Sequence, residues 1–345
     1  FGKFLRLHFT SGGALCGGSV ERYLLEKSRV VQQEPGERSF HAFYHLCAGA
    51  SDAERARLQL RNPKEAAAAF ALLTAGECVS VAAIDDVALH AEASAALDSL
   101  HAQAGASADV PQLWALLAGV LHLGNVRFEA DESSGVAVGG GAVARLADDA
   151  KYAAAAAAAL LGVEAGALLR ALAKRTISAG GEEMELDKSA AEAAASRDAL
   201  AKAIYERLFD RLVAVVNDCL GGAPAGAVGS IGLLDIFGSE VFETNSFEQL
   251  LINFANEKLQ SHFTATAIGL VQQEYAREGI DVARIEYTDN APVVALLEGK
   301  PLSLLGLLDD QCLQAGATDA SFVRLLFSEF DGHAALGRAR PGAAD

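Results

Sequence analysis

Alternating and periodic apolar positions divide the chain into expected strands and helices. Leu5, Leu7 and Phe9 alternate with other residues, a turn signal follows at 11–13, and a second strand is expected over 14–25, so the sequence predicts a β-hairpin. Helical spacing or composition predicts helices over four further stretches: 39–48, 111–125, 153–159 and 190–220. Trp114 and His122 lie on the second of these helices, where both are expected to be core or rim residues.

The most distinctive pattern begins with a short apolar run at 231–237 whose one charge is Asp235. Such a run is typical of a strand buried on both faces of a sheet, where a carboxylate is costly unless something pairs with it. Phosphate-handling enzymes place an acid there to hold Mg²⁺, directly or through water. Gly238 would let a backbone N–H approach a phosphate closely, and Glu240 adds a second carboxylate. An ordinary strand-to-loop exit is the alternative interpretation.

A long helix is predicted directly after this acidic loop. Asn245 and Ser246 are start signals, and apolar residues follow Phe247 at i+3, i+4 and i+7. Gly279 is a natural stop. A helix over 247–278 would be roughly 48 Å long, which suits a lever more than a simple hydrolase, although a long core helix has the same pattern.

Composition narrows the class of protein. The chain has 345 residues, 51% of them hydrophobic, enough for one large or two ordinary domains. The net charge of −17 and the pI near 4.9 argue against a nucleic-acid surface or an anionic membrane partner. No apolar stretch is long enough to span a bilayer, and residues 1–9 lack the layout of a secretory signal. Five scattered cysteines are expected of a reduced, cytosolic protein.

The run DIFGSE at 235–240, followed by FETNSFEQLLINFANEKLQSHF at 242–263, closely resembles switch II and the relay helix of the myosin motor domain. FGKF at 1–4 resembles the tail of switch I, and 23–46 again resembles myosin. The stretches 111–128 and 296–327 are similar to the upper and lower 50-kilodalton regions of that family. The resemblance implies a helix-rich α/β fold related to the P-loop NTPases. It also implies an internal fragment, because no Gly-x-x-x-x-Gly-Lys occurs in the sequence and the Asn-x-x-Ser-Ser-Arg of switch I is not in it.

Site roles follow from the same resemblance. Asp235 would hold Mg²⁺ through water, and Gly238 would donate its N–H to the γ-phosphate of ATP. Glu240 would pair with a switch I arginine and help to position the attacking water. The residues expected beside the nucleotide are Phe1, Gly2 and Lys3, and those expected to relay movement toward the converter are Asn245, Phe247, Glu248, Asn256, Glu257, Ile280 and Asp281.

Three positions depart from the family pattern. Ser239 and Arg211 stand where many myosins have Phe and Trp, and Val282 replaces an aromatic residue of the relay loop. Kinesins have Gly-Ser-Glu at the position of 238–240, so serine is compatible with ATPase chemistry in a related motor.

The resemblance predicts a cytoplasmic, cytoskeletal actin motor that, when complete, hydrolyses MgATP and binds light chains or calmodulin on a neck beyond this segment. Residues 1–229 would be the switch I tail and upper 50-kilodalton region, and 230–345 the switch II, relay and lower region. The 345 residues alone are expected to be inactive. The alternatives are a non-catalytic interaction module, favoured by the three departures, and a kinesin-like microtubule motor, which the EQLLINFANEKLQ helix opposes.

Overall fold

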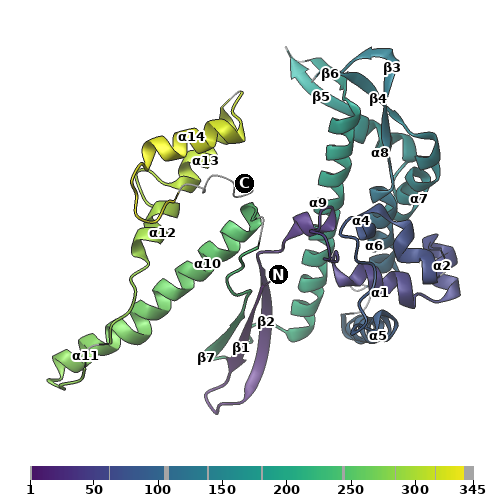
Figure 1. Ribbon diagram of the computed structural model, residues 1–345. Coiled ribbons are helices and arrows are strands. Elements are labelled where there is room, and N and C mark those ends of the chain that lie inside the picture. The colour runs from purple at the N-terminus through teal and green to yellow at the C-terminus, as the bar shows by residue number, and fades with distance from the viewer. Residues whose placement is uncertain are drawn as a thin grey trace. The chain divides into compact units, whose positions relative to one another are not determined.

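The computed structural model describes residues 2–61, 63–104, 109–137, 140–179, 182–242, 245–283, 285–314 and 316–337 (Figure 1). The chain divides into two compact units, Phe1–Asp235 and Ile236–Asp345, each with its own hydrophobic core. The predicted mixture of helices and sheet is confirmed. The predicted functional division between residues 229 and 230 stays a prediction.

In its described residues, the first unit contains three small sheets and most of the helices. Its elements in chain order are β1 (Gly2–Phe9), β2 (Leu15–Tyr23), η1 (Lys27–Val30), α1 (His41–Gly49), α2 (Asp52–Leu58), α3 (Pro63–Ala66), η2 (Ala67–Ala69), α4 (Ala71–Thr74), α5 (Asp86–Ala104), α6 (Val110–Gly124), β3 (Phe128–Val136), β4 (Ala142–Leu146), η4 (Asp148–Ala150), α7 (Lys151–Leu161), α8 (Ala165–Ala173), β5 (Lys174–Ala179), β6 (Glu182–Asp187), α9 (Ala190–Leu220) and β7 (Gly229–Asp235). The predicted β1–β2 hairpin and the four predicted helices are therefore confirmed.

The largest sheet has the order β2-β1-β7, with antiparallel neighbours throughout. The expectation that residues 231–237 form a strand buried on both faces is wrong in its burial, because every residue of β7 is exposed. Among the described strands, β7 is an edge strand with one hydrogen-bonded neighbour, β1, so its apolar side chains are not enclosed as they would be in the centre of a sheet.

The core of the first unit lies among α1, α6, α7 and α9. Trp114 is 6% exposed and His122 is 3% exposed, which confirms both as core residues. Tyr205 of α9 stacks on Phe40 with ring centroids 4.4 Å apart. Aromatic contacts between segments far apart in the sequence thus fix α9 against the helices around α1.

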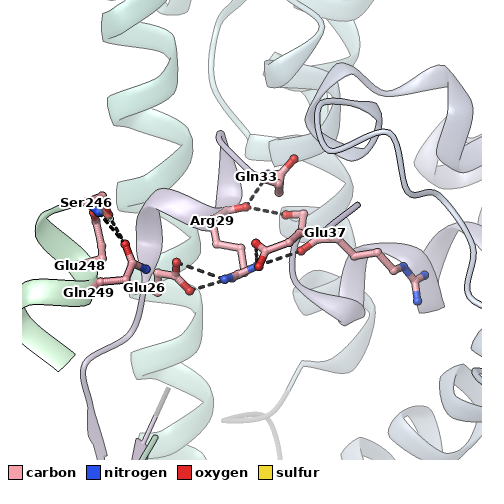
Figure 2. A network of polar contacts seen from close by, with 9 residues as sticks. Glu26, Arg29, Gln33, Glu37, Ser246, Glu248 and Gln249 are labelled. Carbon is pink, nitrogen blue, oxygen red and sulfur yellow. Dashed lines mark hydrogen bonds and ion pairs between the residues drawn. The ribbon is translucent and has the colours of Figure 1, made fainter. Parts of the chain in front are cut away.

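A polar network supports the chain just before α1. The Arg29 side chain donates to the carboxylate of Glu26 at 2.7 Å and to that of Glu37, also at 2.7 Å (Figure 2). Its carbonyl accepts from the Gln33 amide and the Ser39 hydroxyl. One half-buried guanidinium therefore joins η1 to the loop that leads into α1.

Two strand pairs of the first unit were not predicted. In the glycine-rich segment 133–141, β3 continues to Val136 and pairs with β4, while 138–139 lie outside the described residues. The stretch 160–184 contains α8 and then β5, which pairs with β6, while 180–181 lie outside the described residues. These strands are largely polar or exposed, so the apolar pattern gave no signal for them.

The second unit is helical. Its elements are α10 (Phe247–Phe263), the π-helical η5 (Thr264–Leu270), α11 (Val271–Arg277), α12 (Ala291–Glu298), α13 (Leu304–Leu313) and α14 (Asp319–Glu329). The first three run on without a break, as Figure 1 shows, and confirm the long helix predicted over 247–278. It ends where Gly279 takes a φ of +70°. The π segment was not predicted.

Within the described residues, no single helix is long and apolar enough to cross a membrane. One pair of shorter helices, 148–161 and 165–173, passes a test of length and composition together but is bent by 110°.

Candidate functional site

Asp235 ends β7 in the first unit, and Lys3 of β1 lies directly opposite it. The Lys3 Nζ is 3.2 Å from Asp235 Oδ2, and the two side chains are 49% and 70% exposed. The partner expected for this carboxylate is therefore present, although the charge is not buried. Carboxylate oxygens suit Mg²⁺, so the donor chemistry fits the expected role. The described residues contain no group of three or more His, Cys, Asp or Glu that could hold a metal ion.

The residues expected beside the nucleotide at the start of the chain, apart from Asp235, are Phe1, Gly2 and Lys3. Gly2 is buried and pairs with Tyr23 of β2. Phe1 lies outside the described residues. Lys3 is placed beside Asp235, so two of the residues predicted near the nucleotide meet in one strand pair.

Gly238 in the second unit has no structural reason to be glycine among the described residues. A Cβ built on it would meet nothing within 4 Å, and its φ is not in the left-handed region. Gly232 in β7 differs, since a Cβ there would lie 2.5 Å from the Phe4 ring. The open space at Gly238 fits a backbone N–H that approaches a ligand.

Glu240 is half-buried, and its backbone is held by Asn253 of α10. Asn253 Oδ1 accepts from the Glu240 N–H at 2.8 Å, and Asn253 Nδ2 donates to the Glu240 carbonyl at 2.7 Å. The Glu240 carboxylate makes no ion pair with any described residue, so the predicted salt bridge stays a prediction. Sequence reasoning missed Asn253. A signal existed, because asparagine is unfavourable inside helices and usually has a specific partner there.

Asn256, one turn further along α10, holds the other side of Gly238. Its Nδ2 donates to the carbonyl of Phe237 at 3.0 Å and to that of Ile252 at 2.9 Å. Two asparagines of one helix thus fix the backbone at 237 and at 240, on either side of Gly238. Asn256 was predicted as a relay residue, and this contact gives it a physical connection to the loop.

The start of α10 is capped as the sequence predicted. The Ser246 N–H donates to Gln249 Oε1 at 2.9 Å, and the Ser246 hydroxyl donates to Glu248 Oε2 at 2.8 Å (Figure 2). Asn245 forms a reciprocal pair with the backbone of Phe242, with both distances 2.9 Å. These contacts give α10 a defined first turn directly after the acidic loop.

The remaining predicted relay residues are spread along the second unit. The Glu257 carbonyl accepts from Asn290 Nδ2 at 2.9 Å, which joins α10 to the start of α12. The side chains of Phe247 and Ile280 are about half exposed, and Asp281 is exposed. The structure brings none of these three to the loop around Gly238, so their relay role remains a prediction.

Comparison with known proteins agrees with these features. The sequence model of the family "Myosin head (motor domain)" matches residues 1–344. The chain is 41% identical to the myosin IE heavy chain of Dictyostelium discoideum, over 96% of this chain and 32% of the relative. It is 39% identical to myosin-2 of Arabidopsis thaliana, with 94% and 25% covered, and 40% identical to unconventional myosin-Ic of Bos taurus, with 94% and 30% covered. The chain thus spans about a quarter to a third of the length of these relatives.

Proposed function

This chain belongs to the myosin head family, and from that premise we propose that it forms part of an actin-based motor whose complete form binds and hydrolyses ATP with Mg²⁺. The proposal includes ATP and Mg²⁺ as ligands and actin filaments and light chains or calmodulin as partners. It also includes a cytoplasmic, cytoskeletal location. The kinesin-like alternative is wrong, because the family match covers residues 1–344.

Three residues of the 235–240 segment carry the proposed ATPase roles. Asp235 would contribute to the Mg²⁺ shell through water. Its carboxylate is exposed, and its ion pair with Lys3 would be given up at little cost, because exposed ion pairs are weak. Gly238 donates its N–H toward the γ-phosphate, for which its open surroundings leave room. Glu240 pairs with a switch I arginine and helps to orient the attacking water. The bound MgATP supplies the transferable phosphoryl group and the charge-neutralising metal, and the protein contributes mainly positioning and charge stabilisation.

The contact between the loop and α10 is the observation that carries the proposal. Asn253 and Asn256 bind the backbone at Glu240 and Phe237, so a shift of the Gly238 segment displaces two hydrogen-bonded points of α10. α10 runs through η5 and α11 to residue 277, far beyond the loop. The relay residues Ile280 and Asp281 follow directly. A phosphate contact at one end of this helix would thereby move the other end.

The test uses the longer protein that contains this chain, assayed for MgATP hydrolysis with and without actin filaments. Glu240→Ala is expected to lower actin-activated turnover roughly 10²-fold or more, because it removes the group that positions the water. Glu274→Ala, which removes an exposed carboxylate of α11, is the matched control and should keep turnover near the parent value. Full activity of Glu240→Ala would refute the assignment.

The 345 residues by themselves are proposed to be inactive. They contain no Gly-x-x-x-x-Gly-Lys run to cradle the phosphates. Turnover by the purified chain above that of its Glu240→Ala variant would contradict this.

A non-catalytic interaction module is the second candidate, favoured by the three departures from the family pattern. Ser239 is exposed, Val282 is 48% exposed, and Arg211 also lies at the surface. A longer protein that binds actin filaments but shows neither ATP binding nor turnover would favour this candidate over the motor.

A further inference from the structure

A cavity of ≈ 360 Å³ lies in the first unit between α1, α5, α6 and α9. Leucines supply most of its walls: Leu97 and Leu100 from α5, Leu113 and Leu117 from α6, and Leu208 and Leu212 from α9. Its size falls within the range of small-molecule sites, and its lining includes none of the residues proposed to bind nucleotide.

The cavity is a recess in the unit and not an open apolar face. None of its large apolar side chains is exposed: Trp114 and Tyr205 are each 6% exposed, and the leucine walls are buried or half-buried. A docking surface for a protein segment would present exposed apolar side chains instead. The geometry therefore favours a small molecule as the occupant.

Two hydrogen-bond donors at the wall lack partners. The Tyr205 hydroxyl has no hydrogen-bond partner among the described residues, although the residue is only 6% exposed. Its ring stacks on Phe40 and lies against Phe43. Burial alone raises the pKa of Tyr205, so the phenol remains a neutral donor at physiological pH. The Trp114 Nε1–H is buried and likewise has no partner within the part of the chain that the structure describes. An acceptor on a ligand would give such a donor a hydrogen bond that it lacks in this chain.

The lining also defines which ligands are excluded. No charged side chain of the described residues lines the cavity. A charged ligand would lose its hydration without compensation, whereas an apolar body has little hydration to lose and contacts the leucine walls. The favoured ligand is therefore neutral and mostly apolar.

We propose that this cavity binds a small, neutral, mostly apolar molecule that carries one hydrogen-bond acceptor, and that the Tyr205 hydroxyl donates to that acceptor. The proposal does not depend on ATP hydrolysis, because none of the lining residues belongs to the 235–240 segment.

Tetralone and tetralin test the proposal as a matched pair, because they share a bicyclic body and differ by one carbonyl acceptor. Binding to the 345-residue chain is followed by NMR of the indole N–H of Trp114, the single tryptophan, which lines the cavity. Both ligands should shift this resonance, and tetralone should bind about threefold to tenfold more tightly. Tyr205→Phe should remove that advantage and leave tetralin binding unchanged. Equal affinities of the parent chain for the two ligands would overturn the role of Tyr205.

Filling the cavity provides an independent readout. Ala93→Leu adds a side chain to the wall on α5, and it should weaken binding of both ligands at least tenfold, because the added atoms occupy the ligand space. Ala91→Leu, on the exposed side of the same helix, is the control and should bind as the parent does. Ala96→Leu replaces the first variant if that one does not fold. Undiminished binding by a folded filling variant, or no binding by the parent, would overturn the proposal. Loss of binding in the longer protein would also overturn it, by showing that a protein segment fills the recess.

Discussion

The side-chain amide of Asn253 satisfies both backbone groups of Glu240, accepting from its N–H at 2.8 Å and donating to its carbonyl at 2.7 Å. The arrangement mimics one rung of a β-ladder, with a helix side chain in place of a second strand. It fixes the backbone of the predicted catalytic glutamate to α10 while leaving the Glu240 carboxylate free of ion pairs within the described chain. The position of Glu240 is therefore set by α10 and not by its own side chain.

Removing this amide should loosen the loop at Glu240. Asn253→Ala is expected to speed hydrogen exchange of the Glu240 amide about tenfold, because the mutation deletes the acceptor of that N–H and about 1 kcal/mol of local stability. Asn256→Ala is the matched control, since Asn256 binds the Phe237 carbonyl and no N–H of the loop. Unchanged exchange at Glu240 in Asn253→Ala, measured residue by residue, would contradict this.

Gly238→Ala and Gly232→Ala should differ in their effect on the free energy of unfolding. At Gly238 a Cβ meets open space, so Gly238→Ala should change the free energy of unfolding of this chain by less than about 1 kcal/mol. At Gly232 a Cβ would lie 2.5 Å from the Phe4 ring, so Gly232→Ala should destabilise by about 1–3 kcal/mol. In the longer protein, Gly238→Ala should nevertheless lower MgATP turnover. Urea denaturation and the ATPase assay together check this pair, and a large stability loss at Gly238 would show a structural role instead.

Arg22 of β2 bonds to two carboxylates of α9, Glu206 at 3.2 Å and Asp210, while Lys27 shares Glu206. Arg22→Met should destabilise the chain by about 1 kcal/mol, because it leaves two half-exposed carboxylates without this partner. Arg277→Met, which removes an exposed pair on α11, is the control and should be close to neutral. The measurement is the thermal unfolding temperature at low and at high salt. Equal unfolding temperatures of the two variants at low salt would contradict the role of this network.

The same network should appear in the acid stability of the chain. The Lys27 bond lowers the pKa of Glu206, and the Arg22 bond lowers the pKa of Asp210. A carboxylate whose pKa is lower in the folded chain stabilises the fold at pH values above its ordinary pKa, which is 4.5 for Glu206 and 3.8 for Asp210. That contribution disappears as the pH falls through the pKa of the folded chain. When the pH is lowered from 5 to the point of acid unfolding, the free energy of unfolding should therefore fall less for Arg22→Met than for the parent chain. Parallel pH curves for the two proteins would argue against this linkage.

His122 should make the chain less stable under mildly acidic conditions. It is 3% exposed and its Nε2 is 3.1 Å from the Leu58 carbonyl, and burial lowers the pKa of the imidazole below 6.5. Since the folded pKa is below the unfolded one, the stability is complete above pH 6.5 and declines as the pH falls below it. His122→Gln should show a shallower loss of the urea midpoint between pH 7.5 and 5.5. The exposed His262→Gln variant should keep the steepness of the parent.

Local signals in the sequence explain why most elements could be predicted. Ser189 forms a capping box with Glu192, and Gly221 takes a φ of +74°, so both ends of α9 are encoded by residues next to them. Ser246 and Gly279 do the same for the long helix that begins with α10. The strands β5 and β6 were missed because polar strands of a small exposed hairpin show no apolar alternation.

The sequence alone determined the positions of the main helices, the order of chemical groups in the 235–240 segment and the resemblance to the myosin head, because these depend on residues close together in the chain. Only the tertiary structure decided which residues meet across long separations. In the folded chain Asp235 pairs with Lys3 across two strands, and β7 is exposed at a sheet edge. The backbone of Glu240 is hydrogen-bonded to Asn253, and a recess lies beside Tyr205. Each of these depends on packing between distant segments, which periodicity along one segment does not specify.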